Sequence, residues 1–340
     1  MPEKIEVYPL LCKCLLKEKI WGGRKLVTLF DFALPIDAKI GEAWIVADLP
    51  EGTSSIINGP LGGKTLSHIT QSWGHKLIGT AWNNTSTDGR FPLLIKYLDA
   101  CDDLSVQVHP DEESCQRYFP KEFSKDESWI ILDAEPNGMI LHGFNPEVTL
   151  QDFDRLLSQD RVIECMRHIK VSRGEVYRLE PGTVHSICKG VALLEIQEPS
   201  DSTFRIFDYN RLGEDGKPRA LHIQEARKVM RFGDSTPPQI QPQKTMTSWG
   251  EHELLVDVPA YRIERISITR PFSWNINPVS MQVLILLDGS LSLQSTGDTL
   301  NLRKGDGVIL PATLGKVDIK LISCDALGIL TGAGRVPMIH

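Results

Sequence analysis

The chain has 340 residues, of which 41% are hydrophobic and 24% are charged. This balance is typical of a soluble globular protein and excludes a disordered or fibrous chain, while the length suggests about two domains. Lys and Arg total 37 against 44 Asp and Glu, and the resulting net charge of -7 disfavours nucleic acid as a partner but allows a small anion to bind where a few basic side chains converge.

Strands dominate the first two thirds of the sequence. Short stretches rich in Val, Ile, Leu and Phe alternate with turns of Gly, Pro, Asn and Asp, which is the pattern of a mainly β protein. The predicted strands are, in chain order, Ala43–Asp48, Leu93–Asp99, Leu104–His109, Ser128–Leu132, Glu175–Leu179, Val191–Gln197 and Phe204–Phe207.

A few helical segments interrupt these strands. Apolar spacing favours helix in some of them, and Thr149 with Asp152 three residues later predicts a capping box at the start of another. The expected helical segments are Thr65–Trp73, Phe153–Leu157 with Val162–His168, and Ile223 to about Phe232. They do not alternate with strands as βαβ units do, so we expect helical insertions around a β core in the N-terminal half.

The stretch Gly233–Ser248 has the composition of an extended linker, with three prolines among Gln and Thr. We place the domain boundary there, which gives domains of residues 1–240 and 241–340. From Tyr261 to Ile329 the sequence is a succession of strands separated by turns such as Asp288-Gly289. The second domain is therefore expected to be all-β.

An internal repeat links the two halves. The segment from Gly174 to His185 is echoed by the segment from Gly305 to Gly315, and Pro-Gly-Thr-Val-His at the end of the first aligns with Pro-Ala-Thr-Leu-Gly at the end of the second. A repeated strand–turn–strand unit suggests two copies of one barrel. Because Gly315 stands where the first copy has His185, only the first barrel can hold a metal in this way.

Four side chains of the first half have the character of metal ligands. Alternation along a strand places Gln107 and His109 on one face, Glu127 starts the next predicted strand, and His185 follows a Pro-Gly turn. Zinc accepts His nitrogen and Glu oxygen, and N and O ligands discriminate poorly between zinc, manganese, iron and cobalt. The alternative is that both histidines are structural.

The Gly174–His185 run resembles the second sequence motif of the cupins, which are small double-sheet jelly-roll barrels. The expected fold is therefore mainly β, with two cupin-like barrels: a metal-binding barrel with helical insertions and a C-terminal barrel without metal ligands. Such a fold also allows an iron-dependent cupin oxygenase or a non-catalytic sugar-phosphate-binding cupin.

Much of the chain, from residue 19 to residue 211, resembles the class I, zinc-dependent mannose-6-phosphate isomerases of the compact bacterial type. The matching segments are Lys19–Gly23, Gly41–Trp44, Asn58–Pro60, Gly63–Thr65, Phe91–Lys96, Asp103–Asp111, Glu127–Trp129, Pro181–His185, Leu194-Glu195 and Ser200–Arg211. The sequence departs from the family where Ser124-Lys125-Asp126 replaces Gly-Lys-Thr and where Ser128 stands in place of a common Cys.

The resemblance implies a reversible aldose–ketose isomerisation of mannose 6-phosphate and fructose 6-phosphate through an enediol, with one Zn²⁺ per chain. Arg205 matches the family's catalytic arginine, and its charged planar fork suits a developing oxyanion or a phosphate. Lys96 is a candidate for phosphate binding or proton transfer, unless it is an exposed residue at a strand end. Glu195 is a candidate for contacting the substrate or supporting a ligand, unless it is a solvated strand residue.

The cysteines and the apolar runs indicate the compartment. Seven cysteines are an odd number and show no zinc-ribbon spacing, so we expect mostly reduced thiols. Charged residues interrupt the first 16 positions, and the apolar run Val283–Leu287 is far shorter than the roughly 20 residues that cross a bilayer. The sequence predicts a cytoplasmic protein without a membrane partner.

Overall fold

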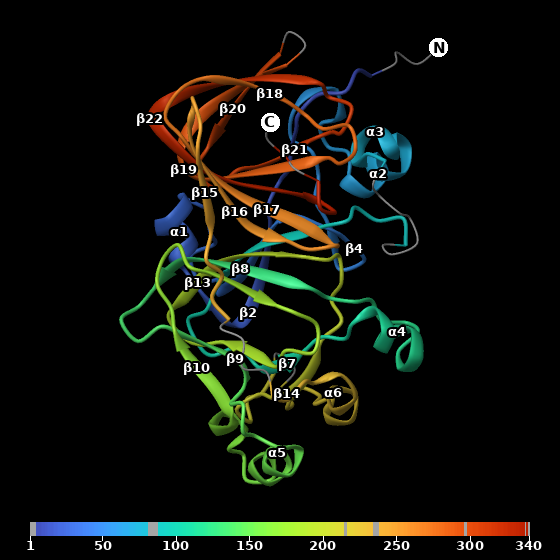
Figure 1. Cartoon of the computed structure of the whole chain (residues 1–340), viewed down its shortest axis with the longest axis vertical. Coiled ribbons are helices and arrows are strands. Elements are labelled where there is room, and N and C mark those ends of the chain that lie inside the picture. The colour runs from blue at the N-terminus through green and yellow to red at the C-terminus, as the bar shows by residue number, and fades with distance from the viewer. Residues whose placement is uncertain are drawn as a thin grey trace.

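A computed structural model describes residues 5–80, 88–213, 216–233, 238–295, 298–336 and 338. Two mainly β halves are stacked along the long axis of the molecule, the N-terminal one below and the C-terminal one above (Figure 1). The expected mainly β class is therefore confirmed. None of the helices in the described part of the chain is long and apolar enough to cross a membrane.

Two sheets build the N-terminal half. The six-stranded sheet has the order β11-β8-β13-β6-β3-β2, and the five-stranded sheet has the order β10-β9-β12-β7-β14. Strands of the first are β2 (Leu15–Gly23), β3 (Ile40–Val46), β6 (Leu94–Asp99), β8 (Glu127–Ala134), β11 (Val176–Leu179) and β13 (Val191–Gln197). Strands of the second are β7 (Val106–Val108), β9 (Met139–Phe144), β10 (Met166–Lys170), β12 (His185–Ile187) and β14 (Phe204–Phe207).

The six-stranded sheet is covered on both faces. Leu193 and Ile131 join a core with Leu104 and Ile187 of the five-stranded side, while the alternate residues Leu194 and Ile130 join a core shared with the C-terminal half. Because both faces are covered, β13 is buried along its whole length. Strands buried on both sides appear in the sequence as nearly continuous apolar runs. The six-stranded sheet thus lies between the five-stranded sheet and the C-terminal half.

The C-terminal half is one large antiparallel sheet that also includes the first strand of the chain. Its order among the described residues is β1-β21-β19-β22-β17-β16-β15, with β18 on β22 and β20 on β19. Its strands are β1 (Leu10–Leu11), β15 (Gln243–Met246), β16 (Gly250–Asp257), β17 (Tyr261–Ile268), β18 (Phe272–Asn275), β19 (Gln282–Ser295), β20 (Asp298–Arg303), β21 (Gly307–Leu310) and β22 (Lys316–Ala333). A separate pair joins β4 (Asp48–Leu49) and β5 (Gly52–Thr53).

No closed barrel is found among the described strands, so the expectation of two jelly-roll barrels is confirmed only in its coarser form of a mainly β chain with several sheets. The predicted repeat has the same local shape in both halves. Strand β11 passes through the turn at Pro181-Gly182 into β12, and strand β21 passes through Pro311-Ala312 into β22.

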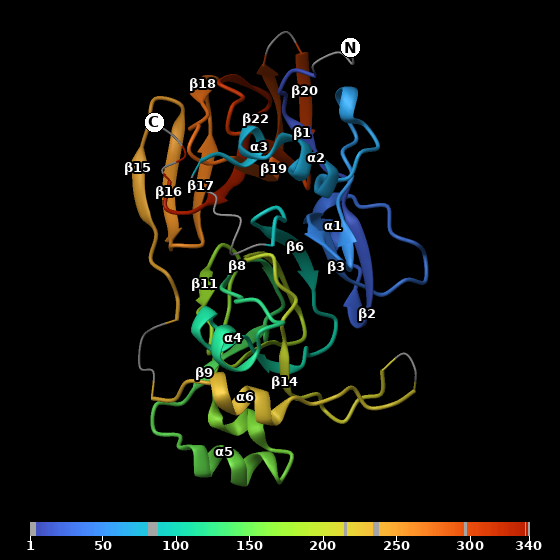
Figure 2. The ribbon, with the colours of Figure 1, turned by 90° about the vertical axis from the view of Figure 1, so that its right-hand side faces the viewer.

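Short helices connect the strands. They are α1 (Lys25–Phe30), α2 (Leu66–Trp73), α3 (His75–Ile78), α4 (Glu112–Tyr118), α5 (Leu150–Leu157) and α6 (Ile223–Val229), with 3₁₀ turns η1 (Gly59–Leu61) and η2 (Val162–Cys165). The capping box at Thr149 is confirmed, because its hydroxyl accepts from the Asp152 N–H and the Asp152 carboxylate accepts from the Thr149 N–H. Helices α5 and α6 lie at the far end of the N-terminal half (Figure 2).

Two secondary-structure predictions were wrong. Of Val162–His168 only the first turn is helical, and the chain then becomes strand β10, which pairs with β9. The predicted linker Gly233–Ser248 contains β15, an exposed polar strand that forms the outer edge of the C-terminal sheet (Figure 2). Both strands are specified by pairing with a partner rather than by apolar alternation. Residues 234–237 of this stretch lie outside the described residues.

Candidate active site

Two adjacent strands of the five-stranded sheet and one strand of the six-stranded sheet bring the predicted ligands together. His185 at the start of β12 is directly opposite Gln107 on β7, and His109 follows β7 immediately before Pro110. Glu127, the first residue of β8, reaches them from the opposing sheet. The Pro-Gly turn before His185 is fixed as well, because the Gly182 N–H donates to the His109 carbonyl at 2.9 Å.

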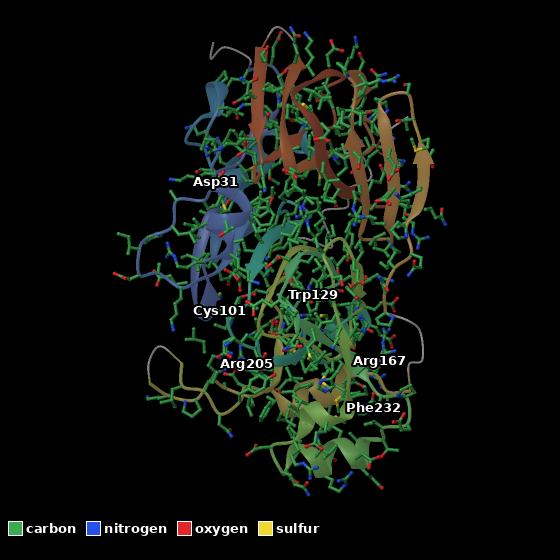
Figure 3. All side chains as sticks on the ribbon, turned by 90° about the vertical axis from the view of Figure 1, so that its left-hand side faces the viewer. Asp31, Cys101, Trp129, Arg167, Arg205 and Phe232 are labelled. Carbon is green, nitrogen blue, oxygen red and sulfur yellow. The ribbon has the colours of Figure 1, made fainter. Side chains whose placement is uncertain are left out.

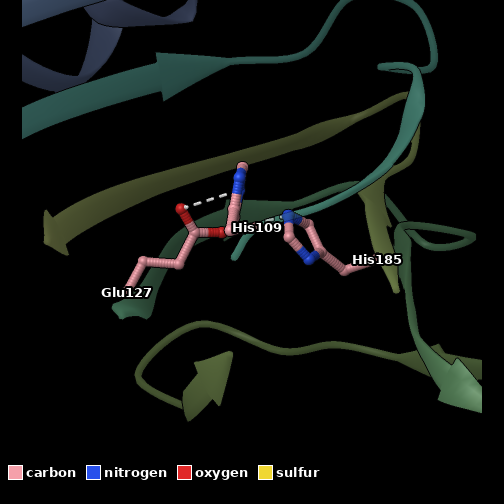
Figure 4. Close-up of side chains that lie close together, drawn as sticks. All are labelled: His109, Glu127 and His185. Atoms are coloured by element: carbon pink, nitrogen blue, oxygen red, sulfur yellow. Dashed lines mark ion pairs between the residues drawn. The ribbon is translucent and has the colours of Figure 1, made fainter. Parts of the chain in front are cut away.

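The ligand atoms of His109, Glu127 and His185 all lie within 4.8 Å of one another (Figure 4). The Nε2 atom of His185 is 3.1 Å from Glu127 Oε1, and the Nε2 atom of His109 is 3.5 Å from Glu127 Oε2. Their side chains are 1%, 2% and 0% exposed for His185, His109 and Glu127. Among the described residues this is the one group of His, Cys, Asp and Glu with the spacing of a metal site.

Hydrogen bonds fix which nitrogen of each ring is available. The Nδ1 atom of His109 donates to the Ser202 carbonyl at 2.7 Å, and that of His185 donates to the Thr183 carbonyl at 2.8 Å. A carbonyl can only accept, so each neutral ring carries its proton on Nδ1 and turns the Nε2 lone pair towards Glu127. Burial, followed by the charge of Lys125, lowers the pKa of His109 to about 3 and keeps this ring neutral.

The donor set fits a divalent ion. Both carboxylate oxygens of Glu127 are buried and accept no hydrogen bond of regular geometry from the described residues. Burial raises the pKa of Glu127, but the nearby Lys125 charge and the contacts with His109 and His185 together outweigh it, and the pKa lies well below its usual range. Two lone pairs and an ionised carboxylate therefore converge where zinc finds its preferred N and O ligands.

Gln107 completes the group from the side. Its Nε2 atom is 3.3 Å from His185 Nε2, and its Oε1 atom is 3.4 Å from the Ser105 hydroxyl. The two ends of an amide have nearly the same shape, so a half-turn of the side chain would present the oxygen to an ion. Gln107 thus lies where the sequence placed it.

Lys125 belongs to the same centre, although the sequence did not identify it as a site residue. Its side chain is 4% exposed, and its Nζ atom lies 2.9 Å from Glu127 Oε2 and 3.1 Å from His109 Nε2. The available signal was its position two residues before Glu127, which puts both side chains on one face of an extended chain.

A second buried ion pair lies on the six-stranded sheet. Lys96 and Glu195 are directly opposite on β6 and β13, with 2.8 Å between Nζ and Oε1, and Glu195 Oε2 accepts a hydrogen bond from the Trp129 indole at 3.0 Å. Burial lowers the pKa of Lys96, but the charges of Glu195 and Glu42 outweigh it and raise the pKa. Neither residue is an exposed strand residue, so that alternative is excluded for both.

Arg205 faces the cavity from β14, directly opposite Gln107, and is labelled in Figure 3 together with Trp129. Its Nη1 atom donates to the Ala220 carbonyl at 3.0 Å, and its buried Nε atom has no hydrogen-bond partner among the described residues. Burial, followed by the charge of Arg219, lowers the pKa of Arg205.

Arg219 is a further basic residue of this wall that the sequence did not identify. Its guanidinium donates to the Asp208 carboxylate, with Nε at 2.7 Å from Oδ2. Strict alternation along β14 would place Phe207 on the face of Arg205. The pairing of β14 with β7 shifts between Arg205 and Phe207, and this irregularity turns Phe207 into the outer apolar cluster instead of placing it on the face of Arg205.

A cavity of about 260 Å³ joins these groups. Its wall includes all but two of the predicted site residues, namely Lys96, Gln107, His185, Glu195 and Arg205. Lys125 and Arg219, which the sequence did not identify, also line it. The two exceptions, His109 and Glu127, contact Lys125 behind this wall. A pocket whose wall holds candidate metal ligands together with the guanidinium groups of Arg205 and Arg219 is suited to a small anionic substrate.

Comparison with known proteins gives one consistent result. Residues 10–154 match the model of the phosphomannose isomerase type I catalytic domain. GmuF of Bacillus subtilis strain 168, a probable mannose-6-phosphate isomerase, is 34% identical over 323 residues, which cover 92% of this chain and 96% of the relative.

Solved structures agree with the sequence comparison. The mannose 6-phosphate isomerase of Bacillus subtilis has a TM-score of 0.83 and 29% identity, over 95% of this chain and 99% of that one. A zinc-bound mannose 6-phosphate isomerase shares the fold, with a TM-score of 0.73 and 17% identity over 96% of this chain and 100% of that chain. On the strength of the relative's identity and its nearly complete coverage, the chain belongs to the type I phosphomannose isomerase family.

Proposed function

We propose that this protein catalyses the reversible isomerisation of mannose 6-phosphate and fructose 6-phosphate, with one Zn²⁺ per chain held by Gln107, His109, Glu127 and His185. The observation that carries the proposal is a buried metal-type donor set beside a cavity whose wall includes His185 and two arginines. The chain aligns over nearly its whole length with a probable mannose-6-phosphate isomerase and with a solved mannose 6-phosphate isomerase. This similarity supports the same chemistry here.

A divalent ion at this centre would polarise the sugar carbonyl or hold the adjacent hydroxyl groups. The isomerisation moves a proton between C2 and C1, so negative charge develops on the oxygens of those carbons. Arg205, directly across from Gln107, would donate to such an oxygen with its planar fork. Its buried and unpartnered Nε atom is a donor that a substrate oxygen would satisfy.

Arg219 would bind the phosphate at the other end of the substrate. Asp208 accepts hydrogen bonds from Arg219 and also from Arg211, so Arg219 is held in one orientation before any ligand arrives. A preoriented guanidinium matches the geometry of phosphate oxygens. Arg205 and Arg219 repel each other, and this repulsion would be relieved when an anion binds between them.

Lys96 and Lys125 would position the sugar hydroxyls. Glu195 holds Lys96 at 2.8 Å, and Trp129 in turn holds Glu195, so this ammonium group is fixed at the wall of the cavity. Lys125 projects from the metal side of the same cavity. We propose that Glu195 acts through Lys96, because its Oε1 atom forms the ion pair with Lys96 and its Oε2 atom accepts from Trp129.

The finer features of the fold are part of the same proposal. We infer two cupin-like barrels, a metal-binding one in residues 1–240 and a second without metal ligands in residues 241–340, and a cytoplasmic enzyme. The support is the repeated strand–turn–strand unit and the facing sheets of the N-terminal half. Manganese, iron or cobalt could replace zinc, because the N and O donor set does not discriminate strongly between them.

The direct test follows the reaction with the zinc-loaded protein. A coupled assay should show fructose 6-phosphate forming from mannose 6-phosphate, and hydrogen at C2 should exchange with deuterium from solvent. His185→Ala should abolish both signals, while Arg161→Ala, at an exposed residue paired with Glu164, should change neither. If the parent protein binds the sugar phosphate but gives neither product nor exchange, it is a binding protein; dioxygen uptake would identify an oxygenase.

A further inference from the structure

Strand β8 separates the candidate metal centre from the C-terminal half. Side chains alternate along a strand, so Glu127 points towards the site while its neighbours Asp126 and Ser128 point the other way. Both neighbours meet Tyr261, which begins β17 in the C-terminal sheet and is completely buried. A residue of the other half thus contacts both neighbours of a candidate metal ligand.

The Tyr261 hydroxyl joins the two neighbours into one chain of hydrogen bonds. It donates to Asp126 Oδ1 at 2.7 Å and lies 3.0 Å from the Ser128 hydroxyl. A tyrosine has one hydroxyl proton and an ionised carboxylate only accepts, so that proton goes to Asp126 and Ser128 donates to Tyr261.

Asp126 is held at several points. Its carboxylate also accepts two hydrogen bonds from the Arg178 guanidinium, and its backbone N–H donates to Glu198 at 2.9 Å. The carboxylate is therefore a rigid partner for Tyr261.

Glu127 needs this support more than the histidines do. A backbone carbonyl orients each histidine ring, but the Glu127 carboxylate accepts no hydrogen bond of regular geometry from the described residues. Its position is set by the ion pair with Lys125 and by the strand that carries it. The residues that fix this strand therefore determine where the carboxylate lies.

We propose that Tyr261 is a positioning residue for the metal centre: by binding Asp126 and Ser128, it holds the β8 backbone so that Glu127 meets the ion in the ligating geometry. The C-terminal half, which has no ligands of its own in this scheme, thereby contributes to metal affinity. The inference rests on the proposed role of Glu127 as a ligand.

Tyr261→Phe tests the proposal, because it removes the hydroxyl and keeps the ring. Metal-stripped protein is titrated with Zn²⁺ against a chromophoric chelator, and with Co²⁺ while the visible spectrum of the ion is recorded. We expect Zn²⁺ affinity to fall by about tenfold, in the lower range for partners of metal ligands, and the Co²⁺ spectrum to change. At saturating Zn²⁺ the turnover number should recover, because Tyr261 does not line the cavity.

Tyr97→Phe is the matched control. Tyr97 is equally buried in the same apolar core, and its hydroxyl lies 3.5 Å from the Gly305 carbonyl. This variant should keep the Zn²⁺ affinity within twofold of the parent, and an equal loss in both variants would show a general effect on the core and overturn the proposal. So would an unchanged affinity in Tyr261→Phe.

Ser128→Ala covers the case in which Tyr261→Phe does not fold. It deletes one hydrogen bond of the same chain and should lower Zn²⁺ affinity by a smaller factor; no loss in this variant would also overturn the proposal. Metal affinity is measured without substrate. A parent protein that binds Zn²⁺ but does not isomerise mannose 6-phosphate would therefore contradict the proposed function and leave this test intact.

Discussion

Each histidine of the candidate centre is oriented by one backbone carbonyl, and this determines how the centre responds to mutation. The Nε2 lone pairs of His109 and His185 face the Glu127 carboxylate. Without an ion, the Lys125 ammonium group is the positive charge that lies against these electron-rich atoms. Removing either ring should cost the ion rather than the fold, because the apolar clusters on both faces of the six-stranded sheet are formed by other residues.

The purified protein should therefore hold about one divalent ion per chain, as one set of donors allows. Elemental analysis of the parent, of His109→Ala and of His185→Ala checks this expectation, with the exposed His68→Ala as the control. Two tight ions per chain, or an ion retained after both active-site histidines are removed, would contradict the assignment.

Arg205 should tolerate lysine poorly. Lysine keeps the charge but loses the planar fork, and the loss of one directed donor to a developing oxyanion costs on the order of 10²–10³ in rate. Arg205→Lys should lower kcat by about that factor while the zinc content remains unchanged. Steady-state kinetics and metal analysis of the same preparation decide; activity within twofold of the parent would refute the role.

Arg219 should act on binding rather than turnover. If its guanidinium holds the phosphate in ground and transition states alike, Arg219→Gln should raise KM by about tenfold or more and change kcat much less. Arg161→Gln is the control, since Arg161 is an exposed arginine outside the cavity. A fall in kcat at constant KM would place Arg219 at the reacting carbons instead.

Local patterns in the sequence were sufficient to find the residues that the structure brings together as candidate ligands, but not the residues around them. Gln107 with His109 and the Pro-Gly-x-x-His185 turn are local patterns, so the sequence revealed them. Lys125 had one local signal, its spacing of two residues from Glu127. Arg219, by contrast, lies beyond strand β14, and Tyr261 contacts the neighbours of Glu127 from the other half. Their positions depend on how distant strands pair, which no local pattern encodes.

At the scale of elements, the turn before His185 requires glycine. Gly182 has a φ of 90°, and a Cβ atom there would lie 2.7 Å from the Val229 carbonyl oxygen. Because the same turn carries the hydrogen bond from Gly182 to His109, displacing it would move both histidines of the candidate centre.

Gly182→Ala should consequently lower both the melting temperature and the Zn²⁺ affinity. Gly174→Ala is a closely matched control, because Gly174 has a φ of 91° and nothing lies within 4 Å of the added Cβ atom. The control should show only the roughly 1–2 kcal/mol cost of the left-handed conformation. Equal Zn²⁺ affinity in the two variants, measured by competition with a chelator, would show that the turn does not set the ligand geometry.

The elements that the sequence predicted well carry a local signal of their own, which is an apolar run, apolar spacing or a cap. Strands β13 and β14 were predicted with their full bounds, and α2 and α5 were recognised from apolar spacing and caps. The failures, β10 and β15, are strands with little apolar alternation, which a partner strand stabilises. The shift in β14 at Phe207 is another effect of pairing, invisible in the sequence of the strand itself.

At the scale of the whole molecule, the metal should matter for turnover but not for folding. The apolar cores extend through both halves and are formed by residues other than the candidate ligands. A zinc finger, by contrast, folds only with its ion. Treatment with a chelator should abolish activity and leave the circular dichroism spectrum near room temperature largely unchanged. Global unfolding of the metal-free protein would show that the ion is part of the fold.

The pairing of β1 with β21 has a consequence for the synthesis of the protein on the ribosome. Leu10 pairs with Ile309, which emerges about 300 residues later, after roughly 15–60 s of elongation at typical rates. Until then the C-terminal half covers only part of the apolar face of the six-stranded sheet that includes Ile130 and Leu194. A nascent chain stalled near residue 240 carries every proposed ligand but should depend on chaperones to remain soluble, and fragment 1–240 expressed alone should aggregate unless residues 241–340 are supplied with it.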